Sequence, residues 1–280
     1  MRKTRIKQLK IKANNIRKSI ILMLEEAKSG HTAGSLGMAD IFTYLYFEHA
    51  NININNIQSQ DRDYIILSNG HICPVQYATL AEKNIIGKEQ LLTFRKINTK
   101  LQGHPHRGTI PGLETTSGPL GSGLSQACGI ALSLKNDEKN NKVICCTSDG
   151  EHGEGNHWEA VLFANKYKLN NLTTIIDRNN IQIDGKTEDI MPLNKLKDKY
   201  ESFGWHSQEI NGHDFKQIHQ AVKKATKTKK PSVIIAMTTP GKGVSFTEND
   251  HTWHGKPPSE QQAIQAFKEL NKERQKIENE

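Results

Sequence analysis

A carboxylate, a glycine and an amide lie in this sequence at a spacing that could bring oxygen ligands together. Asp149 and Gly150 follow one apolar run, with Glu154 shortly after, and Asn179 ends the next apolar run. The 28 residues between Gly150 and Asn179 fit one strand, helix and strand unit. Carboxylate, amide and carbonyl oxygens suit Mg²⁺, which often shares its site with phosphates. Gly150 would let a backbone amide approach an anion.

The glycine-rich segment 118–124 opens a predicted helix and is a second candidate for ligand binding. Its amides and the helix N-terminus could bind a diphosphate or cap a cofactor ring. A dinucleotide-binding loop is the competing interpretation, because Gly121 and Gly123 are followed by the strand-end acid Asp149. That fingerprint requires an apolar strand directly before the glycines. Residues 112–117 supply no convincing strand, which makes a nicotinamide enzyme the weaker hypothesis.

Five of the 12 histidines lie in glycine-containing segments at predicted strand or helix ends: His31, His71, His104, His251 and His254. A single histidine in such a place is more often a hydrogen-bonded structural residue. Five on predicted ligand-facing loops favour a site that moves protons or binds phosphate near neutral pH. Zinc is the alternative, but the histidines show no familiar zinc-ligand spacing.

Strands that alternate with helices must position these residues. Apolar, β-branched runs predict strands at 64–67, 142–147, 172–177 and 232–239, and helical patterns cover 16–27, 38–48, 124–134, 158–167 and 215–225. This alternation predicts an α/β fold, a three-layer parallel sheet with helices on both faces. Ligands in such folds bind at the carboxyl ends of strands. Four polar segments follow the predicted strands, at 68–71, 148–150, 177–180 and 239–243, and all four suit ligand binding.

The chain reads as one domain over residues 1–280, without repeats or an evident linker. Residues 98–123 form its longest stretch without periodicity, and their histidines and glycines favour a functional loop. Eight basic residues and no acidic one occupy the first 18 positions; they equal the whole formal net charge of +8 and leave residues 19–280 neutral. A basic N-terminal arm at about 1–12 and a solvated helical tail at about 259–280 are therefore expected.

Composition also excludes several classes of protein. The longest apolar runs have five residues, far below the roughly 20 that cross a bilayer, so no membrane span is expected. The N-terminus lacks the apolar region of a secretory signal. The four cysteines include no CxxC pair, which favours a reduced, cytoplasmic location. The neutral body predicts no nucleic-acid partner, and a nucleic-acid binder stays a hypothesis resting on the basic arm alone.

Six motifs in order resemble those of the transketolase family, over roughly residues 10–260. They are Gly30-His31-Thr-Ala-Gly-Ser-Leu-Gly-Met-Ala-Asp40, Leu67-Ser-Asn-Gly-His71, Gly103-His104-Pro, Gly112-Leu-Glu-Thr-Thr-Ser-Gly118-Pro-Leu-Gly121, Ser148-Asp-Gly150 through Glu154-Gly155, and Asp177-Arg-Asn-Asn-Ile181. Ser148 stands where the wider thiamine family has glycine, and transketolases commonly carry serine there. The resemblance implies a thiamine-diphosphate-binding fold, specifically the diphosphate-binding domain.

The resemblance also implies roles for individual residues. Asp149, Asn179 and the Ile181 carbonyl would bind Mg²⁺, for which Ca²⁺ or Mn²⁺ could substitute. Residues implied to bind thiamine diphosphate are His71, Gly118, Pro119, Leu120, Asp149, Gly150, Glu154, Asn179 and His251. His31, His104, His251 and His254 would face the sugar substrate and assist proton transfer, and of the last two His251 is favoured.

The length of the chain carries a further expectation. Single-chain transketolases are more than twice as long, and their second domain supplies the glutamate that activates the cofactor. The resemblance therefore implies one subunit of a split transketolase, active with a C-terminal subunit that carries the pyrimidine-binding and C-terminal domains, as an α2β2 assembly. It would transfer a two-carbon ketol unit between sugar phosphates. Alternatives are a deoxyxylulose-phosphate synthase-like or 2-oxo-acid dehydrogenase-like component, or a non-catalytic cofactor-binding half.

Overall fold

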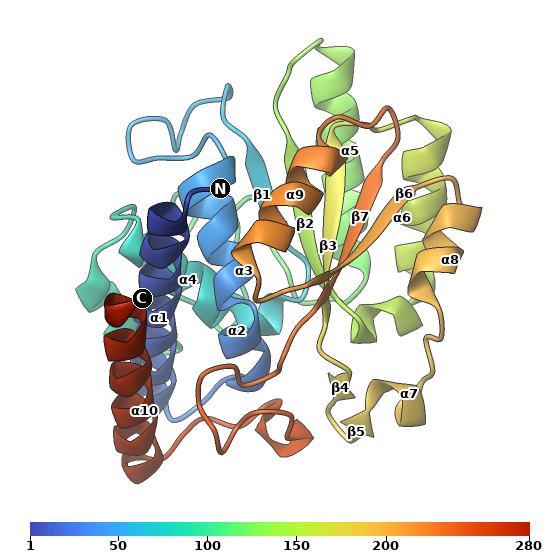
Figure 1. The fold of residues 1–280 in the computed structure, drawn as a ribbon. Helices are drawn as coiled ribbons and strands as arrows, with labels where there is room; N and C mark the ends of the chain where they lie inside the picture. Colours follow the sequence, from blue (N-terminus) through green and yellow to red (C-terminus); the bar gives the residue numbers. More distant parts are fainter.

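The computed structural model describes residues 1–280, and its centre is a five-stranded parallel sheet (Figure 1). The strands are β1 (Tyr64–Leu67), β2 (Val143–Ser148), β3 (Leu172–Arg178), β6 (His206–Asn211) and β7 (Ser232–Met237), in the order β1-β2-β3-β7-β6. Every pairing in this sheet is parallel. The four predicted strands all form, whereas β6 was not predicted. It is an edge strand with mostly polar residues, so it lacks the apolar run of a central strand.

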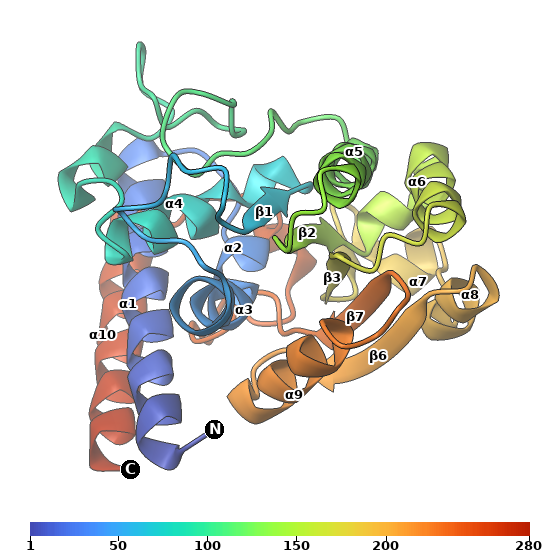
Figure 2. The same cartoon turned by 90° about the horizontal axis from the view of Figure 1, so that it is seen from above.

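Helices cover both faces of the sheet, so the predicted three-layer α/β fold is confirmed (Figure 2). One face carries α1 (Lys3–Ala27), α3 (Ala39–Tyr44), α4 (Cys73–Glu82), α9 (Phe215–Ala225) and α10 (Glu260–Asn279). The other face carries α5 (Ser122–Asn136), α6 (Gly155–Lys166) and α8 (Leu196–Ser202). Strand residues alternate between two separate cores: Ile65 and Leu67 join the first, and Ile66 joins the second.

Short elements fill the connections. They are α2 (Ala33–Gly37), α7 (Thr187–Ile190), the π-helical turn η1 (Leu45–His49), the 3₁₀ turns η2 (Gly70–Ile72), η3 (Lys88–Thr93), η4 (Gly150–Gly153) and η5 (His251–Trp253), and the antiparallel pair β4 (Ile181–Gln182) and β5 (Gly185–Lys186). The single helix expected over 38–48 is α3 continued by η1. Residues 94–121 contain no helix or strand, which confirms most of the stretch expected over 98–123, whose last two residues begin α5. No helix combines the length and apolar character needed to cross a membrane.

The expected N-terminal arm does not exist as a separate segment. Helix α1 begins at Lys3, and it buries Leu9 and Ala13 as well as the predicted apolar positions farther along. Its basic side chains bind groups of the same domain: Arg5 pairs with Glu48 at 2.7 Å, and Lys10 pairs with Glu280 at 2.5 Å. The prediction of an arm was wrong because the apolar pattern of this helix already starts before Ile16. The basic residues around these apolar positions obscured that pattern in the sequence.

The C-terminal segment is a packed helix and not a solvated tail. Helix α10 lies alongside α1, as Figures 1 and 2 both show. It buries Ala263, Ala266, Leu270 and Ile277. Ser259 caps the helix in a capping box with Gln262, which satisfies backbone donors at its first turn. The spacing of these apolar residues fits a helix with one buried face.

Candidate active site

A cavity of about 450 Å³ lies at the carboxyl ends of β1, β2 and β3. Most of the predicted site residues line it: His31, His71, His104, Gly118, Leu120, Asp149, Gly150, Glu154, Asn179, Ile181 and His254. Pro119 and His251 are not among its lining residues. The parallel sheet explains the convergence, because the strand ends meet at one edge and Ser148 is the register partner of Asp177.

One of the four strand-end segments does not reach this cavity, contrary to expectation. Residues 239–243 follow β7 and turn back over α2, where the Gly241 amide donates to the Ala33 carbonyl at 2.8 Å. The Thr239 amide donates to His213 Nε2 at 2.8 Å. The segment is therefore tied to the packing of one layer, and its glycines Gly241 and Gly243 have φ +78° and φ +93° in a tight turn.

The carboxylate of Asp149 is buried and held from two sides. Its Oδ1 accepts a hydrogen bond from the Gly150 amide at 2.8 Å, and its Oδ2 accepts from the Asn180 amide at 2.9 Å and from Arg178 at 3.1 Å. Burial raises the pKa of Asp149, while Arg178 acts in the opposite direction. The carboxylate position is thus fixed by backbone amides of both strand ends.

Two hydrogen bonds orient the Asn179 side-chain amide, so the positions of its nitrogen and its oxygen are defined. Its Nδ2 donates to Asp177 Oδ2 at 2.7 Å, and its Oδ1 accepts from the Ile181 amide at 3.0 Å. Asp177 lines the cavity, although no role was predicted for it. Burial raises the pKa of Asp177 to about 7, and the Asp149 carboxylate adds to that effect. Two close, buried carboxyl groups make this corner of the cavity favourable for a cation.

The ligand chemistry of this corner fits a hard metal ion. No group of three or more His, Cys, Asp or Glu side chains lies together as a metal site. An ion here would have to use Asp149, the oxygen of Asn179 and a backbone carbonyl, an oxygen set of the kind Mg²⁺ accepts. Buried polar atoms without partners lie on segments that border the cavity, at His31, Asn69 and Ser117. These orphaned atoms suit a polar ligand, because unpaired buried groups are unfavourable.

Glu151 is a buried residue behind the cavity for which sequence analysis made no prediction. Its buried carboxylate accepts hydrogen bonds from the hydroxyl of Ser68 and from the amides of Gly121 and Ser148, both amide bonds at 2.9 Å. It therefore joins the end of β1, the glycine-rich loop and the end of β2. Burial raises the pKa of Glu151, against the effect of these three donors. Its signal in the sequence was weak, because a glutamate after Asp-Gly resembles a solvent-facing turn residue.

The glycine-rich loop meets α6 at Gly121. This residue has φ +77°, and a Cβ there would lie 2.2 Å from Asn156 Oδ1. Only glycine fits such a conformation and contact without strain. Leu120, directly before this turn, is 37% exposed and lines the cavity, as does Gly118.

Three histidine rings pack against one another on one wall of the cavity. The ring centroid of His31 lies 4.8 Å from that of His71 and 5.4 Å from that of His254, and His71 and His254 are 5.2 Å apart. Burial lowers the pKa of His31 to about 4 and lowers that of His71 and of His254. The cluster is therefore neutral at neutral pH.

The other two predicted histidines, His104 and His251, differ in their position relative to the cavity. His104 is exposed at the opening of the cavity, and burial and Arg95 together lower its pKa. His251 lies one turn before His254, in η5, away from the cavity lining. Of this pair, His254 lines the cavity and His251 does not.

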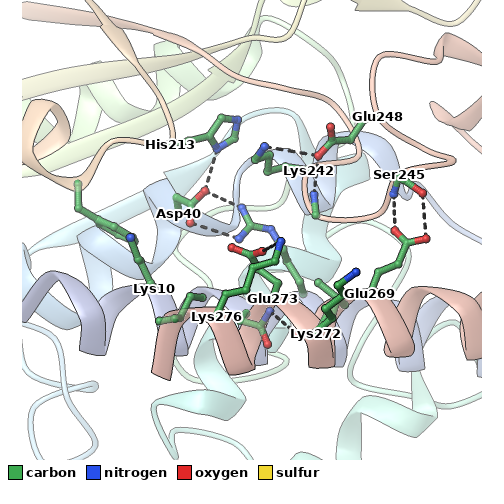
Figure 3. Close-up of a pocket in the computed structure, with 16 residues that line it drawn as sticks. Lys10, Asp40, His213, Lys242, Ser245, Glu248, Glu269, Lys272, Glu273 and Lys276 are labelled. Atoms are coloured by element: carbon green, nitrogen blue, oxygen red, sulfur yellow. Dashed lines mark hydrogen bonds and ion pairs between the residues drawn. The ribbon is translucent and has the colours of Figure 1, made fainter. Parts of the chain in front are cut away.

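A second cavity, of about 500 Å³, lies between α1, α10 and the segment after β7 (Figure 3). Asp40 is at its base, where Oδ2 contacts Arg17 at 2.6 Å and His213 at 2.8 Å. Burial acts in the opposite direction, but Arg17 and His213 lower the pKa of Asp40 to about 2. None of the predicted site residues lines this cavity, and its charged side chains largely pair with each other.

A parallel sheet whose strand ends carry a polar cavity, buried oxygen ligands and packed histidines defines an α/β cofactor-binding domain. Residues 8–277 match the family model of the transketolase thiamine diphosphate binding domain. The chain therefore belongs to the transketolase family, and the resemblance found in its motifs is confirmed.

Two groups of relatives differ in length. The chain is 36% identical to an apulose-4-phosphate transketolase subunit from Phocaeicola vulgatus, over 98% of each chain. It is 38% identical to the 6-deoxy-6-sulfo-D-fructose transketolase subunit of a Clostridium species, over 95% of this chain and 97% of that subunit. It is also 35% identical to human transketolase, of which it covers 42%. The crystal structure of Campylobacter jejuni transketolase superposes with a TM-score of 0.88 at 34% identity. The match covers 94% of this chain and 42% of that one, so the chain spans less than half of the long relatives.

Proposed function

We propose that this chain is the thiamine-diphosphate-binding subunit of a split transketolase that transfers a two-carbon ketol unit from a ketose phosphate to an aldose phosphate. The cavity at the strand ends supports the proposal, because it gathers buried oxygen ligands, a glycine-rich loop and neutral histidines in one place. The relatives that this chain matches over nearly their full length are named as transketolase subunits.

The cofactor would lie along the strand ends. Asp149, the oxygen of Asn179 and the Ile181 carbonyl would hold Mg²⁺, and His71 and Gly150 would contact the diphosphate. The ring system would lie against the exposed loop of Gly118, Pro119 and Leu120, with Glu154 beside it. Thiamine diphosphate, when bound, supplies the carbon nucleophile that attacks the ketose carbonyl. The protein's part is to hold and orient the reactants.

The histidines would bind the sugar. A neutral imidazole can both donate and accept a hydrogen bond, which suits the hydroxyls of a sugar. His31 and His254 would stabilise charge that develops on a substrate oxygen, because their packed rings hold fixed positions in the cavity wall. His104, at the opening, would bind a hydroxyl of the incoming sugar.

A partner chain would complete this site. Leu120, Ile183 and Ile190 line the cavity and are 37%, 72% and 45% exposed. Monomeric proteins rarely leave such apolar groups together at a surface. We propose that a C-terminal transketolase subunit, with the pyrimidine-binding and C-terminal domains, covers this rim in an α2β2 assembly. A cytoplasmic location is part of the proposal, supported by four free, buried cysteines.

Reconstitution tests the function. This chain and a candidate partner would be purified separately, and two-carbon transfer between sugar phosphates would be measured with thiamine diphosphate and Mg²⁺. We expect transfer only from the mixture, and none when Asp149→Ala replaces the native chain. Full activity of this chain alone would refute the split arrangement. Cofactor binding by an assembled complex that transfers nothing would instead favour a non-catalytic half.

A further inference from the structure

Arg95 lies between the two segments that carry His31 and His104. Its Nη1 donates to the hydroxyl of Ser29 at 2.7 Å. On its other side it packs against Gly103, where a Cβ would lie 2.7 Å from Arg95 Nε. Arg95 has φ +59°, an unusual conformation for a side chain of this size. The backbone at Arg95 is therefore strained, and in this conformation the guanidinium lies between the two loops.

The charge of Arg95 has no carboxylate partner. Every other buried or half-buried arginine forms an ion pair, at Arg5, Arg17, Arg62, Arg178 and Arg274. Arg95 is half-buried, forms no ion pair, and its buried Nε has no hydrogen-bond partner. Its guanidinium carbon lies 5.4 Å from the centroid of the Phe94 ring, but a half-buried charge without a carboxylate partner is still unfavourable for stability. The position of this charge near two cavity histidines points to a role in the site.

The surroundings of His31 make this charge effective. Burial is the main cause that lowers the pKa of His31, followed by His254, Arg95 and His104. His71 is also packed against it. All four of these causes act in the same direction on the pKa of His31. His104 is more exposed, and after burial Arg95 is the one further cause of its lowered pKa.

We propose that Arg95 is a positioning residue of the substrate site: it joins the His31 and His104 loops through Ser29 and Gly103 and places a positive charge near both imidazoles. The inference rests on the proposed function only where it assigns the two histidines to substrate. The link between the loops, and the effect of the Arg95 charge on the two imidazoles, are properties of this chain alone.

Two substitutions separate charge from shape. Arg95→Gln keeps a planar donor for Ser29 but removes the charge, and Arg95→Lys keeps the charge but loses the planar fork. Histidine titrations in the full chain, followed by NMR, should show the proton affinity of His31 rising roughly threefold to tenfold in Arg95→Gln, as expected for one lost charge nearby. The rise should be smaller at His104, which water screens, and small at both in Arg95→Lys. Arg274→Gln is the matched control and should leave both histidines unchanged.

Catalysis gives the second readout. In the reconstituted enzyme, Arg95→Gln should lower kcat/KM and move its acidic limb to higher pH, with thiamine diphosphate affinity unchanged. Unchanged histidine titrations in Arg95→Gln, or equal changes in Arg95→Gln and Arg95→Lys, would overturn the proposal. If Arg95→Gln does not fold, Ser29→Ala removes the link and keeps the charge, and a native pH profile with native kcat/KM in that variant would refute the positioning role. Altered titrations in a chain that shows no transfer with any partner would refute the proposed function alone.

Discussion

Replacing Glu151 by glutamine should weaken cofactor binding, although this side chain does not line the cavity. The carboxylate accepts from two backbone amides, at Gly121 and Ser148, each with a different oxygen. A glutamine offers one acceptor oxygen and one NH₂ group. Either orientation of the amide therefore sets the NH₂ against a backbone N–H. The Ser68 hydroxyl can rotate to accept, but the backbone donors cannot.

The size of the effect follows from the lost hydrogen bond. A hydrogen bond to a charged group contributes roughly 1.5–3 kcal/mol. To relieve the contact between the new NH₂ group and a backbone N–H, either the glycine-rich loop or the end of β2 must move. The segment that moves would have to return to its native position when the cofactor binds. Because about 1.4 kcal/mol corresponds to tenfold in Kd, we expect the Kd for thiamine diphosphate to rise roughly 10- to 100-fold.

Calorimetric titration of the reconstituted complex with thiamine diphosphate and Mg²⁺ measures this directly. Glu114→Gln is the matched control, because the Glu114 side chain is only 6% exposed and pairs with Arg62, and neither residue lines the cavity. It should lower the thermal stability without changing the Kd. An unchanged Kd in Glu151→Gln, or an equal rise in the control, would refute the argument that Glu151 holds the cofactor loops.

Four other perturbations have expected outcomes. Asp40→Asn should lower the free energy of unfolding by roughly 2–3 kcal/mol at pH 7, because the carboxyl pKa falls from an ordinary 3.8 to about 2 on folding. A lowered pKa stabilises only above it, so the difference from wild type in urea unfolding should shrink as the pH falls from about 4 toward 2, and a constant difference would contradict the assignment. Gly121→Ala should lower the melting temperature and weaken cofactor binding through its φ of +77°. Gly129→Ala, at an open helical position, should raise stability by about 0.5–1 kcal/mol. Removing Mg²⁺ with a chelator should weaken thiamine diphosphate binding at least about tenfold, reversibly on adding Mg²⁺, and an unchanged affinity would contradict the oxygen-ligand site.

The central strands and the cavity could be predicted because local signals and tertiary packing agree there. Strand β1 forms at its predicted residues, 64–67, and Asp149 and Asn179 meet because parallel strand ends must share an edge. Strand β6 could not be found in this way. It lies at the sheet edge, so its burial comes from one neighbour and leaves no continuous apolar run.

Side-chain connections were the less predictable part of the site. The role of Glu151 depends on three segments that meet only in the fold, and no spacing in the sequence encodes their meeting. That His254 lines the cavity and His251 does not depends on the orientation of a short 3₁₀ turn, which the sequence does not reveal. The strand-end rule also failed at residues 239–243, because a polar, glycine-containing loop can equally turn back onto a helix.

The alternation of the sheet places the neighbouring thiols of Cys145 and Cys146 in different cores. Burial raises the pKa of both thiols well above the usual range, so neither reacts while its layer is closed. A thiol reagent would reach Cys145 only when the α5 and α6 layer lifts, and Cys146 only when the α1 and α4 layer lifts. The vicinal pair is thus a built-in reporter of local opening, able to reveal which side of the protein loosens first when a cofactor or partner is withdrawn.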